Sequence, residues 1–314
     1  MIELEALTKH FDTIVAVNNI TLTVQAGEVL ALLGPNGAGK TTTVRMLSAV
    51  LKPTSGHARV AGYDAATHAR TVRAHVGVLT EAPGLYTRMS GREYLDFFGN
   101  LRGMGAAQRR ERIKFLADWF KMTDALDRRL GEYSKGMAQK IALIRTLMHD
   151  PPVLLLDEPT SAMDPESARL VRDAILQMRD DERRAIILCT HNLPEAEELA
   201  DRMAIIRHGE IIECGAPAEL KSRLLGPPLM ELRFAAEPQN GLLPLVERAL
   251  AAQGAAVQEA GASWVRYRTT TPHATNPALL QALADAKASV LTLSEVTQSL
   301  EAVYLRVINE GAVN

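Results

Sequence analysis

The chain has 314 residues, of which 47% are apolar and 23% are charged, and these proportions are those of a folded globular protein rather than a disordered or collagen-like one. Its 35 Lys and Arg residues and 37 Asp and Glu residues leave a formal charge of −2, so we expect no nucleic-acid partner. Two cysteines are too few for a disulfide framework and favour a reducing compartment. No apolar run approaches the roughly 20 residues that span a bilayer, and the first residues lack the features of a signal peptide.

The first 224 residues alternate predicted strands and helices. Residues 1–33 alternate in the manner of strands and end in an apolar run at 29–33, which a Gly-rich loop separates from a helix at 41–51. Further strands are predicted at 76–79, 153–156, 185–188, 203–206 and 211–212. Further helices are predicted at 168–178 and 193–200, and residues 90–149 have a helical pattern throughout. This order predicts an α/β domain over 1–224 with a mostly parallel sheet and a helical insertion at about 86–150.

A linker is predicted at 225–228, because a glycine followed by two prolines cannot continue a helix or a central strand. The elements predicted beyond it are strands at 229–234, 256–259, 264–269 and 290–293 and helices at 242–252, 277–286 and 300–307. Their order, βαββαβ, predicts a small C-terminal α+β domain over 229–314 of the ferredoxin-like kind.

The loop after the apolar run at 29–33 matches the phosphate-binding pattern G-x-x-x-x-G-K-[ST]. Glycines let consecutive backbone N–H groups turn toward one concavity, and the N-terminus of the following helix adds a partial positive charge. The residues expected to hold the phosphates are Gly34, Pro35, Asn36, Gly37, Ala38, Gly39, Lys40, Thr41 and Thr42. Among them Lys40 would reach the β- and γ-phosphates and the Thr41 hydroxyl would be a Mg²⁺ ligand. The alternative is a strand–helix turn that binds nothing.

The apolar strand at 153–156 delivers two carboxylates, Asp157 and Glu158. We expect Asp157 to act on Mg²⁺, commonly through water, because this ion keeps an octahedral oxygen shell and takes few protein ligands. Glu158 would then face the γ-phosphate and polarise a water molecule. Without the phosphate loop, a solvated acidic pair at the end of a strand would be the simpler interpretation.

A third segment identifies the class of nucleotide-binding protein. Residues 133–140, Tyr-Ser-Lys-Gly-Met-Ala-Gln-Lys, precede the Asp157 strand. At this position the ATP-binding subunits of ABC transporters carry their signature sequence, and the chain resembles that family from residue 1 to about 220. The resemblance implies that Ser134, Gly136 and Met137 contact ATP, although the fifth position of the signature is Met137 here instead of Gln. A helix cap without a ligand is the alternative for this segment.

Other positions follow the order of the same family. Residues 161–164 resemble its D-loop, and His191 stands where the family has a histidine that binds the γ-phosphate and orients the attacking water. Phe11 stands where an aromatic ring stacks on adenine, with plain core burial as the alternative. Glu81 occupies the usual place of a Gln that contacts Mg²⁺, so its charge is expected to make engagement of this loop more dependent on the metal.

The resemblance implies a P-loop NTPase of the ABC type that binds and hydrolyses ATP with Mg²⁺. Two copies, or this chain and a paralogous subunit, would close over two nucleotides and drive a separate transmembrane permease, which would hold the chain peripherally on the cytoplasmic face of the membrane. The signature variant and residues 299–305 point toward export. The permease would contact the groove beside the Glu81 loop, where Tyr86, Tyr94 and Phe97 are either interface anchors or core residues.

Two other functions remain open from the residues alone. A soluble ABC ATPase of DNA repair or translation would typically carry a long coiled coil, zinc cysteines or a second ATPase unit, and none is visible. A nucleotide-dependent sensor would keep Lys40 but would have no use for Glu158 and His191. The C-terminal domain carries no catalytic pattern, so we expect a dimer-stabilising or regulatory module rather than a ligand sensor.

Overall fold

The computed structural model describes residues 1–161, 163–235, 242–296, 299–301 and 304. The chain forms two compact units, Met1–Pro217 and Ala218–Asn314. Helix α8 (Pro217–Leu225) begins at this boundary, so the segment predicted as a linker at 225–228 follows the helix. Most of the predicted helix at 300–307 and much of the segment 299–305 lie outside the described residues.

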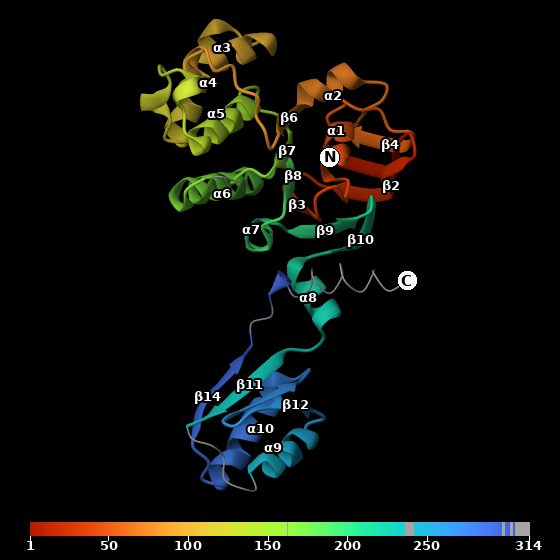
Figure 1. Ribbon diagram of the computed structural model, residues 1–314, viewed down its shortest axis with the longest axis vertical. Helices are drawn as coiled ribbons and strands as arrows, with labels where there is room; N and C mark the ends of the chain where they lie inside the picture. The colour runs from red at the N-terminus through yellow and green to blue at the C-terminus, as the bar shows by residue number, and fades with distance from the viewer. Residues whose placement is uncertain (162, 236–241, 297–298, 302–303, 305–314) are drawn as a thin grey trace. The chain divides into compact units, whose positions relative to one another are not determined.

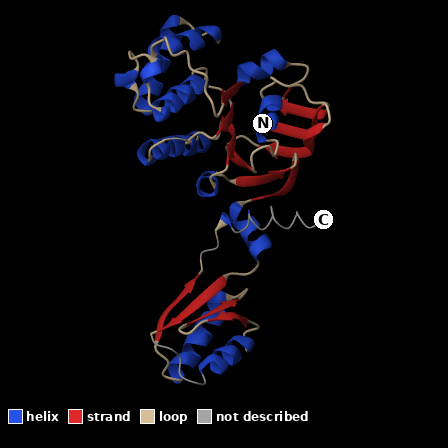
Figure 2. Ribbon diagram, in the orientation of Figure 1, coloured by secondary structure: helices blue, strands red, loops and turns tan. Residues whose placement is uncertain are grey.

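Two sheets build the first unit (Figures 1 and 2). One is antiparallel in the order β2-β1-β4-β5, from β1 (Ile2–Phe11), β2 (Ile14–Val24), β4 (Ser55–Val60) and β5 (Tyr63–Asp64). The other has the order β10-β9-β3-β8-β7-β6, from β3 (Glu28–Leu33), β6 (Val76–Leu79), β7 (Val153–Asp157), β8 (Ala185–Thr190), β9 (Arg202–Arg207) and β10 (Glu210–Gly215). Its strands are parallel except for the pair β9 and β10. The mostly parallel sheet was predicted, whereas β4 and β5 were not.

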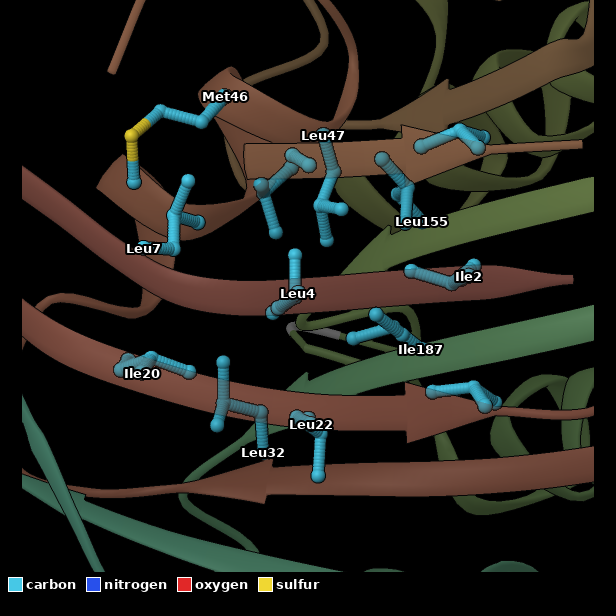
Figure 3. Packing of buried hydrophobic residues seen from close by; sticks show 14 of the residues in the cluster. Ile2, Leu4, Leu7, Ile20, Leu22, Leu32, Met46, Leu47, Leu155 and Ile187 are labelled. Carbon is cyan, nitrogen blue, oxygen red and sulfur yellow. The ribbon is translucent and has the colours of Figure 1, made fainter. Parts of the chain in front are cut away.

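The core of this unit lies between these sheets and the first helix. Every residue of β7 and of β8 is buried, as expected for central parallel strands covered on both faces. Leu32, Leu155 and Ile187 of the parallel sheet belong to the same apolar cluster as Leu4 of β1 and Leu47 of α1 (Figure 3). The parallel strands are thereby held in a fixed register, with Leu33, Asp157 and Thr190 at the same edge.

The helices of the parallel-sheet region differ in their bounds from those predicted. They are α1 (Lys40–Leu47), α2 (Ala69–His75), α6 (Pro165–Asp180) and α7 (Leu193–Leu199). Helix α6 starts three residues earlier than predicted, because the Asp164 carboxylate caps the Ser167 N–H at 2.9 Å and Pro165 occupies the first turn. Helix α2 was not predicted.

The insertion between β6 and β7 is helical, with α3 (Gly91–Leu101), α4 (Ala106–Trp119) and α5 (Lys135–Leu147) joined by short 3₁₀ turns at Thr123–Ala125 and Leu130–Glu132. Helix α3 begins with a capping box between Ser90 and Glu93. Ile113, Leu116, Ala117 and Phe120 are buried, as their common helical stripe predicts.

The second unit pairs a four-stranded antiparallel sheet with two helices (Figure 1). Its elements are β11 (Leu229–Phe234), α9 (Leu242–Ala251), β12 (Ala256–Ala260), β13 (Trp264–Arg268), α10 (Pro272–Asp285) and β14 (Val290–Glu295). The sheet order β12-β13-β11-β14 is that of a split βαβ unit. Helix α10 starts at Pro272 instead of the predicted Pro277, which lies inside the helix. Of the helices in the described ranges, none has the length and apolarity to cross a bilayer.

Candidate functional site

The phosphate loop follows β3 and leads directly into α1, which begins at Lys40. Gly39 has a φ of 114°, and a Cβ there would lie 2.6 Å from the Ala16 carbonyl oxygen, so only glycine fits. A Cβ on Gly34 would lie 2.3 Å from the Ile206 carbonyl oxygen. Pro35, Asn36 and Gly37 form the exposed rim, and Ala38 is buried. The loop is therefore packed against neighbouring backbone on one side and open on the other.

Lys40 turns its side chain back across this loop. Its Nζ donates to the carbonyl oxygens of Gly34, at 2.5 Å, and Pro35, at 3.1 Å. Lys40 is only 9% exposed, so its ammonium is a nearly buried charge held among backbone oxygens. Thr41 is exposed and Thr42 half-buried in the first turn of the helix. The positive charge and the helix N-terminus thus lie at one place, where they favour an anion.

Asp157 lies at the end of β7 across from the phosphate loop. The Thr41 hydroxyl donates to its Oδ2 at 3.4 Å, which brings together two of the three predicted Mg²⁺ ligands. Burial raises the pKa of Asp157, and the charges of Glu158 and Glu81 raise it further. Glu81, on the exposed loop after β6, is therefore close enough for its charge to act on Asp157. Oxygen donors from a hydroxyl and a crowded carboxylate fit the small ligand set that Mg²⁺ takes from proteins.

Glu158 and His191 form a direct pair at the ends of β7 and β8. Glu158 Oε1 lies 2.6 Å from the ring Nδ1 of His191 and accepts the His191 backbone N–H at 3.0 Å. The Glu158 side chain is 13% exposed and that of His191 is 74% exposed. The carboxylate is therefore fixed from within the protein, while the imidazole ring extends toward the solvent.

The backbone of Glu158 is also held in an unusual state. Its φ is 50°, in the left-handed region, and its N–H donates to the Cys189 carbonyl oxygen at 2.8 Å. The side-chain amide of Gln139, on α5, donates to the Glu158 carbonyl oxygen at 3.1 Å. Hydrogen bonds to both the N–H and the carbonyl group of Glu158 thus fix the backbone from which its carboxylate extends.

The segment resembling the signature sequence lies at the start of α5, apart from the phosphate loop at the start of α1 (Figure 1). Ser134 is the N-cap of α5 and accepts the Met137 N–H at 3.2 Å. Helix α5 therefore begins at Lys135, directly after this cap. A Cβ on Gly136 would contact Met163, of the segment resembling the D-loop, at 3.8 Å.

The predicted aromatic residues divide between surface and core. Phe11, at the end of β1, is 43% exposed, so the alternative of core burial is wrong; Lys9 Nζ lies 5.1 Å from its ring centre. Tyr94 is fully buried and its hydroxyl accepts from Arg145 at 2.7 Å, which makes it a core residue. Tyr86 and Phe97 are 50% and 39% exposed, and each packs against the ring of Phe98.

Comparison with known proteins decides the family. A family model for ABC transporters matches residues 17–161. The ABC transporter ATP-binding protein NatA of Bacillus subtilis (strain 168) is 41% identical over 202 residues, which cover 64% of this chain and 82% of NatA. The chain belongs to the ATP-binding proteins of ABC transporters.

Two more similarities support the same assignment. The Nod factor export ATP-binding protein I of Paraburkholderia xenovorans (strain LB400) is 37% identical over 250 residues, covering 79% of this chain and 82% of the relative. A solved structure of an ATP binding subunit of an ABC transporter superposes with a TM-score of 0.67 at 26% identity, over 72% of this chain and 94% of that one. The predicted ABC-type P-loop fold and the predicted ATPase class are confirmed.

The sequence analysis missed the carboxylate of Glu195, which lies beside this site. It lies in the first turn of α7, is 3% exposed and accepts hydrogen bonds from the hydroxyls of Thr160 and Thr190. A Glu in the first turn after a polar strand end is ordinarily a solvated residue that favours the helix dipole. Only its burial distinguishes it, and burial is not written in the local sequence.

Proposed function

We propose that this chain is the ATP-hydrolysing subunit of an ABC-type exporter, which acts as a pair of subunits on a separate membrane permease. The observation that carries the proposal is the bonded pair of Glu158 and His191 at the sheet edge that also bears the phosphate loop. A protein that only bound nucleotide would need the loop but not this pair. The exporter assignment is supported by the similarity to a Nod factor export ATP-binding protein and by the signature variant at 133–140.

In the proposed mechanism the triphosphate lies along the loop from Gly34 to Thr41. Backbone N–H groups and the N-terminus of α1 stabilise the negative charge of its oxygens, and the Lys40 ammonium exchanges its carbonyl partners for β- and γ-phosphate oxygens. Thr41 and Asp157 would hold Mg²⁺, which supplies charge neutralisation of the phosphates when bound. Phe11 offers an exposed ring for the adenine.

Glu158 and His191 would act on the attacking water. The Oε1 atom of Glu158 is occupied by His191, which leaves its Oε2 atom to accept a hydrogen bond from water and polarise it. Nδ1 of His191 faces Glu158, so in the imidazolium form, where both ring nitrogens donate, Nε2 would donate to a γ-phosphate oxygen. The pair thus aligns water and phosphate for an in-line attack.

A second subunit would complete the site. Ser134, Gly136 and Met137 lie at the start of α5, and in the proposed dimer this helix start faces the ATP held by the partner copy or by a paralogous subunit. ATP would then hold the two subunits together, and hydrolysis would release them. The exposed rings of Tyr86 and Phe97 would contact the permease, which would keep the chain at the cytoplasmic face of the membrane. The second unit would stabilise or regulate the dimer.

Turnover of ATP by the purified chain tests the proposal. Glu158→Gln keeps the size of the side chain but removes the base, so hydrolysis should fall by about 10²-fold or more while ATP binding persists. The variant should form a stable dimer on gel filtration with ATP and Mg²⁺. Glu166→Gln, on the exposed start of α6, is the matched control and should hydrolyse ATP as the wild type does. A Glu158→Gln protein that stays monomeric with ATP, or a wild type that binds but never turns over ATP, refutes the proposal and favours a nucleotide sensor.

A further inference from the structure

Glu195 is a buried carboxylate within two hydrogen bonds of the proposed catalytic pair. It is 3% exposed, and its described hydrogen-bond partners are two hydroxyls and no cation. Burying a carboxylate that has no cation bonded to it is costly; the charge of Glu158 nearby adds to that cost, and the charge of Arg172 offsets part of it. A carboxylate retained under these conditions is a candidate for a functional role.

The two oxygens of Glu195 tie together the two loops that carry the site. Thr160 Oγ1 donates to Oε1 at 2.5 Å, and Thr160 follows Glu158 by two residues. Thr190 Oγ1 donates to Oε2 at 3.0 Å, and Thr190 immediately precedes His191. The Asn192 side chain caps the Glu195 N–H at 3.2 Å and fixes the first turn of α7 from which the carboxylate extends.

The Thr190 hydroxyl has a second acceptor within reach. Its oxygen lies 3.4 Å from Glu158 Oε2, against 3.0 Å from Glu195 Oε2. A hydroxyl has one proton to donate, and the Thr190 hydroxyl donates it to Glu195, the nearer of the two acceptors. The hydroxyl oxygen also accepts the Asn192 backbone N–H at 3.0 Å, which holds the oxygen in place whichever carboxylate accepts its proton.

We propose that Glu195 is a positioning residue for ATP hydrolysis. It accepts the hydrogen bond of the Thr190 hydroxyl and thereby keeps Oε2 of Glu158 free to accept a hydrogen bond from the attacking water. Oε1 of Glu158 is already taken by His191, so Oε2 is the oxygen on which the polarisation of water depends. If the Thr190 hydroxyl donated to Glu158 instead, it would take one of the two accepting positions of that oxygen and make the carboxylate a weaker base. The inference rests on the proposed roles of Glu158 and His191.

Glu195→Gln is the decisive variant, because the amide has the shape of the carboxylate but only one accepting atom. The Thr160 hydroxyl, which donates over the shorter distance, should keep the amide oxygen as its acceptor. The amide NH₂ group then faces Thr190 and donates to its hydroxyl oxygen. The Thr190 hydroxyl then donates its hydrogen bond to Oε2 of Glu158. We expect kcat to fall about tenfold with KM for ATP within about twofold, since the loss is confined to the water-activating step.

The second variant distinguishes this role from a merely structural one. Thr190→Val in the Glu195→Gln background removes the competing donor, so kcat should recover to within about threefold of the wild type. Thr160→Val is the matched control: it also removes one hydrogen bond from Glu195 but leaves the Thr190 proton in place, and its kcat should stay within about twofold of the wild type. A kcat of Glu195→Gln equal to the wild type, or a double variant no faster than Glu195→Gln, overturns the inference.

The same assays separate this inference from the proposed function. If Glu158→Gln abolishes hydrolysis but the Glu195 variants behave as the wild type, only the role of Glu195 is wrong. If the wild type does not hydrolyse ATP, the proposed function itself fails. Melting curves with and without ATP confirm that each variant folds and binds nucleotide before its turnover is compared.

Discussion

Two buried carboxylates of the first unit and one of the second unit are held in opposite ways. In the first unit, burial raises the pKa of Asp157 and of Glu195, whose partners are hydroxyls. In the second unit, Glu231 is 7% exposed, and hydrogen bonds from Arg233, at 2.5 Å, and Arg266, at 2.8 Å, lower its pKa. Two guanidinium groups bond to Glu231 and make it a structural tie, whereas Lys40 and Arg172 act on Asp157 and Glu195 only through their charge. A cationic ligand or a reaction therefore gains most at the carboxylates of the first unit.

The contrast extends to other polar groups. The buried Tyr267 hydroxyl of the second unit donates to Asn276 at 2.6 Å, and the Thr269 and Thr275 hydroxyls bond to each other at 2.8 Å. These contacts are complete without any ligand. The segments that follow β3, β7 and β8 instead bring Lys40, Glu158 and His191 to one edge of the sheet. The residues of the candidate site therefore belong to the first unit.

The largest expected effect that tests this division is on stability. Leu232 is fully buried in the core of the second unit, so Leu232→Ala should lower the free energy of unfolding of that unit by about 2–5 kcal/mol. Leu291, 65% exposed on β14, is the matched control, and Leu291→Ala should change stability by less than about 0.5 kcal/mol. Hydrogen exchange of the second unit measures both. ATP turnover per folded protein should be the same for both variants, and a turnover defect in Leu291→Ala would break the comparison.

An intermediate effect is expected where the first unit gathers charge. Glu81→Gln removes one of the carboxylates that raise the pKa of Asp157. The site then attracts the cation less strongly, so half-maximal ATP hydrolysis should need about threefold more Mg²⁺. A titration of turnover against Mg²⁺ measures the shift, with Glu111→Gln on α4 as the control. An unchanged titration curve would show that the Glu81 loop does not engage through the metal.

The smallest expected effect concerns the carboxylate of the second unit that is already neutralised. The pKa of Glu231 is lower in the folded state, so the charged form stabilises the fold above the ordinary carboxyl pKa of about 4.3. This contribution is lost as the pH falls through the lowered pKa. Glu231→Gln should therefore be slightly less stable than the wild type at pH 7 and should approach it in acid. Denaturant unfolding at pH 7 and pH 3 checks the sign, and a stability difference that grows in acid contradicts it.

The sequence predicted the site wherever a side chain follows directly from the end of a parallel strand. Asp157 ends β7 and His191 directly follows β8, so the register of the sheet alone brings them to one edge. Lys40 reaches the same edge through the phosphate loop that follows β3. Glu195 and Gln139 were not predicted because their roles depend on which way a helix faces after packing. Both are polar residues that are more often exposed, and their burial follows from tertiary contacts.

The errors in the fold have similar physical causes. β4 was missed because only Ala58 and Val60 of its six residues are buried, which leaves a weak alternation. Helix α10 was started at Pro277, since proline usually opens a helix, but the structure continues the helix upstream to Pro272. In each case pairing or packing with distant residues outweighed the local pattern.

The left-handed backbone of Glu158 also restricts what evolution or a protein engineer can place there. Branching at Cβ clashes with such a conformation, so Val, Ile or Thr at this position would weaken folding in addition to removing the acid. Asn and Gly tolerate it better, and comparing them with a branched residue would divide any loss into a chemical part and a conformational part. The bend that aims this side chain therefore limits the range of residues through which the position can vary.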